Sequence, residues 1–268
     1  MRFDILTIFP DFFGSPLAEG MIRRALQDGL VSVNIHNIRD FAEDRHAMTD
    51  DRPFGGGEGM VMKPEPLAAA VRHVRAVAPA ARVVLLSPQG RTLNQEIAAD
   101  LAGEEQLILV CGRYEGVDER FRAAYVEREV SIGDYILTGG EPAALVLLDC
   151  LIRLLPGVLG CGDSAENDTF SPGSRGGMKY PQYTRPRVFE GMAVPEILLS
   201  GDHAAIAAWR FCEAVRRTME RRPELLAVAD FSPAERKLLA RHGLPVNQRE
   251  DPLRPAPAAP TAGPEEKL

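Results

Sequence analysis

Three glycine-bearing loops, each at the end of an apolar run, are the parts of this chain best suited to hold a ligand. They read LSPQG at residues 86–90, VCGRYEGVDER at 110–120 and SIGDYILTGGEP at 131–142. Glycine lacks a Cβ, so main-chain N–H and C=O groups there can approach a bound molecule closely. Because loops that follow the strands of an α/β sheet meet at one edge, the sequence predicts a single ligand pocket. The alternative is that these glycines only form tight turns.

Two common nucleotide-binding patterns are excluded. A dinucleotide-binding fold places a glycine-rich turn directly after its first strand, whereas the first apolar run here continues into PDFFG at residues 10–14. The glycine run at residues 55–59 lacks both the Gly-Lys-Ser/Thr ending of a phosphate-binding loop and an apolar strand just before it. We interpret residues 55–59 as a flexible wall of the substrate site.

Strand and helix patterns alternate along the first part of the chain. Short runs rich in Val, Ile and Leu predict strands at residues 2–9, 30–38, 82–87, 106–111 and 125–132. Helical patterns lie between or after them, at residues 15–28, 66–78, 94–101 and 142–155. Asn94 suits a helix cap, and Pro142 suits the first helical position, where its missing N–H costs nothing. This alternation predicts an α/β fold with a mainly parallel sheet.

The second part of the chain is organised differently. Residues 160–186 show little periodicity and much Gly, Ser, Asp and Pro, and a loop of that length is either functional or disordered. Helical patterns resume at residues 202–222 and 232–242, the latter with a capping-box opening at Ser232 and Glu235. We therefore predict an α/β domain at residues 1–159, a linker or lid at 160–186, a small helical domain at 187–245 and a disordered Pro/Ala-rich tail at 246–268.

Composition limits the class of protein. The chain has 268 residues, 45% hydrophobic and 26% charged, which is typical of a soluble globular protein. No apolar run approaches membrane-spanning length, and the N-terminus resembles a first strand more than a signal peptide. The spacing of the cysteines fits neither a zinc site nor a disulfide framework, and favours reduced thiols in a cytoplasmic protein. These cysteines are Cys111, Cys150, Cys161 and Cys212.

Basic residues gather in the second half, although the formal net charge is −7. Residues 171–190 and 204–222 carry an excess of Lys and Arg over acids, as two basic stripes in an acidic chain. Such stripes can bind phosphates, and a solvated helix face is the alternative for any single member. The members are Arg175, Lys179, Arg185, Arg187, Arg210, Arg216, Arg217, Arg221 and Arg222.

Five motifs in order resemble the bacterial tRNA (guanine-N1)-methyltransferase family, over nearly the whole chain apart from the tail. They are FGGGEGMVMKP at residues 54–64, CGRYEG at 111–116, SIGDYILTGGEP at 131–142, PGVLG at 156–160 and YTRP at 183–186. Each motif alone is weak, but five at family-like spacing are highly specific.

The resemblance implies a fold, a reaction and partners. The fold would be a trefoil-knotted, SPOUT-like sheet whose loops hold S-adenosylmethionine; since knots are nearly absent from proteins, the residues alone would favour an unknotted sheet. The reaction would methylate N1 of the guanine just 3′ of the anticodon, position 37 of tRNA. The active sites would lie at the subunit interface of an obligate homodimer. Magnesium assists the family, but no carboxylate cluster here indicates a dedicated metal site.

The resemblance also assigns residues to the cofactor. Apolar side chains and free loop amides could give adenine a flat slot and main-chain hydrogen bonds. The implied cofactor-binding residues are Leu86, Ser87, Pro88, Gly112, Tyr114, Glu115, Ser131, Ile132, Gly133, Asp134, Tyr135, Ile136, Leu137, Gly139 and Gly140.

Asp168 and Arg153 match the catalytic residues of the family. Methylation of guanine N1 requires loss of its proton, so Asp168 is the candidate general base; burial beside the substrate would strengthen an aspartate in that role. Arg153 could stabilise the negative charge that moves to O6. The alternatives are a turn or cap role for Asp168 and pairing of Arg153 with Asp149, four residues earlier on one helix.

Residues 171–180 depart from the family pattern. They are longer than the family's segment and carry Lys179 where an acid is expected; in the family this segment orders over the substrate.

Two other functions stay open. One is a related knotted methyltransferase that acts on a ribose hydroxyl or another base, and the other is a non-catalytic RNA-binding protein that has kept the fold.

Overall fold

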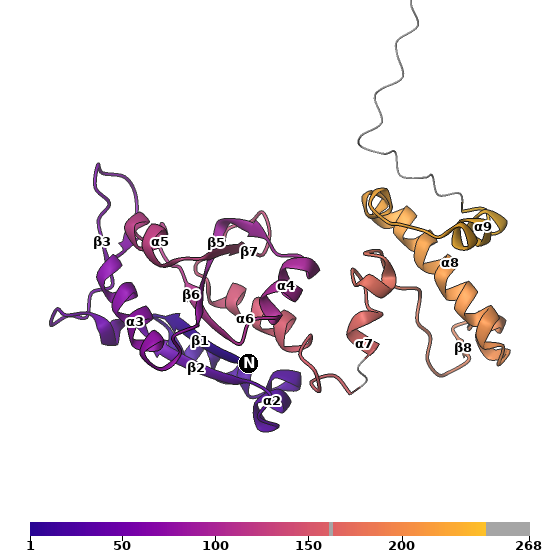
Figure 1. The fold of residues 1–268 in the computed structure, drawn as a ribbon, viewed down its shortest axis with the longest axis horizontal. Coiled ribbons are helices and arrows are strands. Elements are labelled where there is room, and N and C mark those ends of the chain that lie inside the picture. Colours follow the sequence, from indigo (N-terminus) through magenta and orange to yellow (C-terminus); the bar gives the residue numbers. More distant parts are fainter. Residues whose placement is uncertain (161–162, 245–268) are drawn as a thin grey trace, which may run out of the picture. The chain divides into compact units, whose positions relative to one another are not determined.

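The protein divides into two compact units, which we describe separately (Figure 1). The computed structural model describes residues 1–160 and 163–244. The first unit is Met1–Ala165 and the second begins at Glu166, so the division falls inside the segment that the sequence predicted as a linker. The predicted tail at residues 246–268 lies outside the described residues.

A five-stranded sheet forms the centre of the first unit, in the order β2-β1-β6-β5-β7. All neighbouring strands in it pair in parallel, which confirms the predicted α/β class and mainly parallel sheet. The knot that the resemblance implies stays a prediction. The strands are β1 Arg2–Thr7, β2 Ser32–Asn37, β5 Arg82–Thr92, β6 Gln106–Cys111 and β7 Arg128–Ser131.

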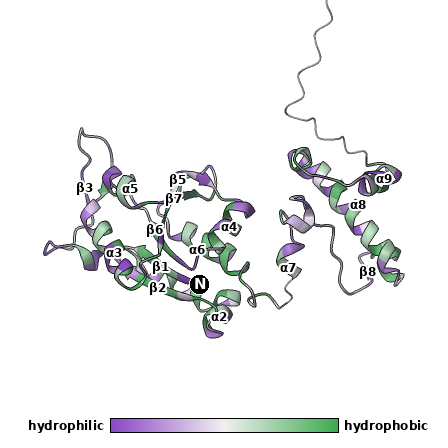
Figure 2. Ribbon diagram, viewed as in Figure 1, coloured by the Kyte–Doolittle hydropathy of each residue, from purple (hydrophilic) through white to green (hydrophobic). Residues whose placement is uncertain are grey.

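Helices cover both faces of the sheet (Figure 1). Side chains alternate along each strand, so Phe3 and Ile5 enter one core cluster while Leu6 and Ile8 enter the other. Figure 2 shows how hydrophobic residues (green) run through these elements. The first cluster is completed by α2 Gly20–Gln27, α4 Gln95–Ala102 and α6 Glu141–Ile152, and the second by α3 Pro64–Val77 and α5 Glu119–Tyr125.

Strand β5 extends beyond its predicted end at residue 87, because its pairing with β7 resumes after a bulge. Leu86 and Arg91 both pair with Val130, so residues 87–90 loop out of the ladder between them. The chain passes so close to β7 that a Cβ on Gly90 would lie 2.4 Å from the Glu129 carbonyl carbon. Only glycine fits there, and the bulge turns residues 87–90 into a loop at the sheet edge.

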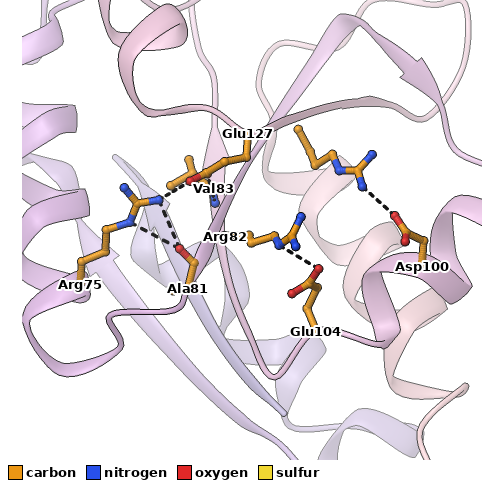
Figure 3. Close-up of polar contacts among 8 residues, drawn as sticks. Arg75, Ala81, Arg82, Val83, Asp100, Glu104 and Glu127 are labelled. Atoms are coloured by element: carbon orange, nitrogen blue, oxygen red, sulfur yellow. Dashed lines mark hydrogen bonds and ion pairs between the residues drawn. The ribbon is translucent and has the colours of Figure 1, made fainter.

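Polar contacts fix the amino-terminal ends of β5 and β7 (Figure 3). The Glu127 carboxylate accepts the Val83 N–H at 2.6 Å and pairs with Arg75 of α3. Arg82 pairs with Glu104 at 2.8 Å. These contacts lie at the opposite ends of the strands from the three glycine-bearing loops, so they stabilise the scaffold without occupying the edge where those loops meet.

The second unit is built on two capped helices, α8 His203–Arg221 and α9 Pro233–Arg241. Asp202 caps α8 by accepting two backbone N–H groups at 3.0 Å, and the predicted capping box of Ser232 and Glu235 is confirmed. A small core forms from Cys212, Val215, Phe231, Leu239 and Leu244.

Short elements complete the described chain. They are α1 Gly14–Leu17, α7 Asp163–Glu166, β3 Asp50–Asp51, β4 Val61–Met62, β8 Val188–Phe189, β9 Met192–Ala193, and the 3-10 turns η1 Pro10–Phe13, η2 Ile38–Phe41, η3 Pro172–Ser174, η4 Glu196–Leu199 and η5 Pro223–Ala227.

Candidate active site

A cavity of about 330 Å³ lies in the first unit, between the bulge of β5 and the loops that follow β6 and β7. Its volume is in the range of small-molecule sites. All of the predicted cofactor-binding residues except Asp134, which is exposed, line this one cavity. The predicted residues in its lining are Leu86, Ser87, Pro88, Gly112, Tyr114, Glu115, Ser131, Ile132, Gly133, Tyr135, Ile136, Leu137, Gly139 and Gly140.

Gly139 and Gly140 allow two of the loops to touch. The Gly140 N–H donates to Gly112 O at 2.8 Å, and a Cβ on Gly140 would lie 2.8 Å from the Cys111 Cα. A Cβ on Gly139 would lie 2.0 Å from the Arg113 Nε. Gly140 therefore needs glycine because it packs against backbone, whereas a side chain at Gly139 would force the Arg113 side chain to move; neither glycine has a positive φ. The backbone, rather than large side chains, forms this wall of the cavity.

A buried ion pair joins these loops to the first strand. The Glu141 side chain is 0% exposed; its Oε1 accepts from Thr7 Oγ1 at 2.7 Å and its Oε2 from Arg113 Nε at 2.9 Å. Arg113 also donates to Thr138 O at 3.1 Å and lies over the Phe9 ring, 4.4 Å from its centroid. Glu141 occupies the first turn of α6, where the helix dipole favours a negative charge. One guanidinium thus fixes three segments around the cavity.

Tyr114 and Glu115 form the other side of the cavity. Tyr114 has a φ of 59°, a left-handed conformation that non-glycine residues rarely adopt. Burial raises the pKa of the Tyr114 phenol, and the neighbouring Asp50 carboxylate raises it further. The Glu115 N–H donates to Met60 O at 2.9 Å, and a Cβ on Gly59 would lie 2.5 Å from Glu115 Oε1. The glycine run at residues 55–59 therefore ends beside the cavity.

The loop after β7 presents apolar side chains at the mouth of the cavity. The Tyr135 hydroxyl donates to Ile132 O at 3.1 Å, and its ring lies against Gly133, where a Cβ would be 2.5 Å from Cε1. Ile136 is 80% exposed and Leu137 is 41% exposed. Exposed apolar groups at the rim of a partly polar cavity are typical of a surface that binds a ligand or another protein.

Arg153 does not line the cavity. It ends α6, where its N–H donates to Asp149 O at 3.3 Å, whereas the first turn of the same helix lies at the cavity.

Pro142 is the second residue of α6 rather than the first, because the helix begins at Glu141.

Asp168 belongs to the second unit. Its Oδ1 accepts the Thr169 N–H at 3.0 Å and lies 3.9 Å from Lys179 Nζ. Its side chain is 34% exposed, so it is accessible to a substrate. The Asp168 carbonyl oxygen also accepts the Ser171 N–H at 3.2 Å, so Asp168 begins a turn.

The other sequence-based expectations concern cysteines, metals and membranes. Burial raises the pKa of the Cys111 thiol well above its ordinary range, which makes it unreactive; Cys161 lies outside the described residues. Across residues 1–160 and 163–244 no group of three or more His, Cys, Asp or Glu could hold a metal ion. No helix in that part of the chain is long and apolar enough to cross a membrane.

The sequence interpretation missed Thr7, Arg113 and Glu141. The sequence does carry a signal for Glu141. Two glycines, an acid and a proline precede an apolar run, and this pattern marks a helix that starts with a charged residue at its buried end. Thr7 has no such signal, because a threonine at the end of a strand is common.

Comparisons with known proteins point to one family. The family model of tRNA (Guanine-1)-methyltransferase TrmD matches residues 1–228. A tRNA (guanine-N(1)-)-methyltransferase of Geotalea uraniireducens is 54% identical over 239 residues, covering 89% of this chain and 96% of that protein. The protein of the same name from Geobacter sulfurreducens is 55% identical, covering 90% and 97%. One from Dehalococcoides mccartyi is 52% identical, covering 89% and 96%. The chain therefore belongs to the tRNA (guanine-N1)-methyltransferase family.

Proposed function

We propose how this chain performs the reaction of its family, transfer of a methyl group from S-adenosylmethionine to N1 of guanine 37 in tRNA. The cavity among the three loops holds the methyl donor, Asp168 removes the N1 proton and Arg153 stabilises the charge on O6. The observation that carries the proposal is that predicted cofactor-binding residues from three separate loops line one cavity.

The residues of the cavity fit the donor. Leu86 is 4% exposed at its base, and Tyr135 and Leu137 add apolar surface for a purine ring. Loop amides near Gly112 and Gly139 can donate to polar edges, while the Gly140 N–H already donates to Gly112 O. Glu115 in the lining suits a positively charged sulfonium, whereas Glu119 and Glu129 of the same lining pair with Arg122. When bound, S-adenosylmethionine supplies an electrophilic methyl group.

In this proposal Asp168 is the general base that accepts the N1 proton. As N1 takes the methyl group, the bond from that group to the donor sulfur would break to leave a neutral thioether, and the N1–H bond would break with its proton passing to the Asp168 carboxylate. The contacts from Thr169 and Lys179 fix the orientation of that carboxylate, and orientation is a large part of the benefit of a positioned base.

Arg153 supports a homodimer as the active form. Ala143 of α6 lines the cavity, and Arg153, the residue that caps the carboxyl end of α6, comes ten residues later. At a rise of 1.5 Å per residue, the two backbone positions are about 15 Å apart along the helix axis. An arginine side chain cannot span that distance back to the cavity of its own subunit. A second copy can supply it, and this favours an active site shared between two subunits.

The surface of the first unit also favours a dimer. Helix α6 is apolar on nearly every side, as expected of a helix that is buried all round, yet Val146 is 43% exposed. Turn η1 contacts α6 and adds Phe9 and Phe12, which are 45% and 42% exposed. The trefoil knot implied by the family is part of the same proposal.

The second unit offers a surface for tRNA. A groove of about 440 Å³ is lined by Arg185, Arg187 and Arg210 together with Tyr180 and Tyr183, and the Arg210 guanidinium lies 4.9 Å from the Tyr180 ring centroid. Cations beside aromatic rings suit phosphates and unstacked bases. We place the protein in the cytoplasm, where this substrate is found.

Other members of the basic stripes have protein partners. Arg175, Arg216 and Arg222 form ion pairs within the second unit, with Glu235, Glu213 and Glu224 respectively. We therefore assign phosphate contacts to the groove rather than to these three arginines.

The test is methyl transfer to tRNA transcripts with and without guanine at position 37. Asp168→Asn should lower kcat by about 10²–10⁴-fold, while the Kd for S-adenosylmethionine, measured by calorimetry, stays at the wild-type value. Asp230→Asn, an exposed aspartate of the same unit, is the control. Wild-type kcat in Asp168→Asn would remove Asp168 from the reaction.

A further inference from the structure

The segment that carries Asp168 is folded onto itself. We call residues 168–179 the Asp168 turn. Its two ends run side by side, since the Phe170 N–H donates to Gly177 O at 2.8 Å and the Lys179 N–H donates to Thr169 Oγ1 at 3.2 Å. The segment therefore closes on itself as a turn.

Ser171 forms the centre of the Asp168 turn. It is 2% exposed, and its hydroxyl lies 2.5 Å from Glu166 O and 2.6 Å from Asp168 O. Gly173 crosses the same backbone so closely that a Cβ there would lie 2.3 Å from Glu166 O. The carbonyl group of Asp168 itself is therefore held by the turn that follows it.

Thr218 attaches the Asp168 turn to helix α8. Its side chain is buried, with 1% of the residue exposed. The hydroxyl accepts the Met178 N–H at 2.9 Å and donates to Ala214 O at 2.7 Å. A Cβ on Gly177 would lie 3.0 Å from the same hydroxyl, so the turn fits Thr218 closely.

Two further contacts tie the turn to the helical unit. Arg175 forms an ion pair with Glu235 in the first turn of α9. The Phe170 ring lies 5.7 Å from the Arg222 guanidinium carbon. Contacts at the start, middle and end of the segment thus connect it to α8, α9 and the residue that caps α8.

We propose that Thr218 is a positioning residue for Asp168: by holding the end of the Asp168 turn on α8, it keeps that turn ordered before RNA binds. This inference rests on the proposed role of Asp168 as the base. A base held in advance avoids the entropy cost of ordering its loop during the reaction.

Hydrogen exchange of the free full-length protein tests the order of the turn without any reaction. The amides of Phe170 and Met178, whose partners are Gly177 O and Thr218 Oγ1, should exchange about 10-fold or more slowly than unstructured amides. Thr218→Val keeps the shape and removes the hydroxyl, so Met178 should lose that protection. Thr218→Ser keeps the hydroxyl and should retain it.

Kinetics then test the positioning role. Thr218→Val should lower kcat about 10-fold with the Kd for S-adenosylmethionine and the affinity for tRNA unchanged, and Thr218→Ser should restore kcat. Unprotected Phe170 and Met178 amides in the wild-type protein would overturn the proposal, as would wild-type kcat in Thr218→Val. If Thr218→Val fails to fold, the exchange of the wild-type Phe170 and Met178 amides still decides it. Wild-type kcat in Asp168→Asn would instead refute the base while leaving the exchange result intact.

Discussion

Breaking the buried pair of Arg113 and Glu141 should damage both stability and cofactor binding. Arg113→Met keeps the apolar stem and removes the guanidinium. Among the residues that the structure describes, it leaves the Glu141 carboxylate, 0% exposed, with the Thr7 hydroxyl as its remaining side-chain partner. Breaking a buried ion pair by removal of one partner costs about 3–5 kcal/mol, a large share of the 5–15 kcal/mol that is typical of a folded domain.

Glu141→Gln should cost less than Arg113→Met. The Arg113 side chain is 17% exposed and also donates to Thr138 O, so after loss of the carboxylate it keeps one partner and some water. An incompletely satisfied polar group of this kind costs about 1–3 kcal/mol. The double variant should cost less than the sum of the two single variants, because the groups interact directly.

The assay is urea unfolding of the full-length protein followed by circular dichroism, with calorimetric titration of S-adenosylmethionine in parallel. Because Arg113 fixes Thr138 beside Gly139 of the cavity wall, the Kd should rise about 10-fold or more, a loss of about 1.4 kcal/mol. Arg120→Met is a matched control, since Arg120 pairs with Asp118 at the surface with 71% of its side chain exposed, and exposed pairs contribute about 0–1 kcal/mol. If Arg113→Met cost no more than Arg120→Met and left the Kd unchanged, the reasoning would be refuted.

Two further predictions concern acid stability and subunit sharing. Burial opposes ionisation of Asp4, but hydrogen bonds from His36 and Arg2 outweigh burial and lower the pKa of the Asp4 carboxyl. The ionised carboxylate therefore stabilises the folded protein at pH values above its ordinary pKa near 3.9. This stabilisation is lost as the pH falls through the lowered pKa. The stability gap between the wild type and Asp4→Asn, from melts between pH 7 and 3, should therefore shrink on acidification, and a constant gap would contradict this. Mixing inactive Arg153→Ala with Ile136→Arg, which blocks the cavity mouth, should restore part of the methyl transfer if two subunits share each site; no recovery after confirmed subunit exchange would count against sharing.

Much of the sheet could be predicted because its strands are buried on both faces. Continuous apolar runs such as Gln106–Cys111 are a strong local signal, and the predicted bounds of β6 match the structure. The extension of β5 to Thr92 could not be predicted, because it depends on the approach of Gly90 to β7, which is not local in sequence. The two-residue strands β3 and β8 are too short to carry a pattern.

The candidate site was only partly predictable, because several of its contacts join residues that are far apart in the sequence. Glycine loops after strands can be recognised locally, and these loops line the cavity. The contact between Thr7 and Glu141 joins residues 134 positions apart, and no periodicity indicates it. The attachment of the Asp168 turn to Thr218 is likewise a tertiary contact, between Met178 and a residue 40 positions away.

The backbone wall at Gly139 and Gly140 bears on inhibitor resistance. A compound that competes with the methyl donor by contacting this wall would meet atoms that substitution cannot easily change, because any side chain there would collide with Cys111 or Arg113. Escape mutations should instead arise at the mouth, where Ile136 and Leu137 are exposed and one apolar side chain can replace another at little cost in stability. Compounds anchored on the main chain of Gly139 and Gly140, rather than on the rim, should therefore keep their potency for longer under selection.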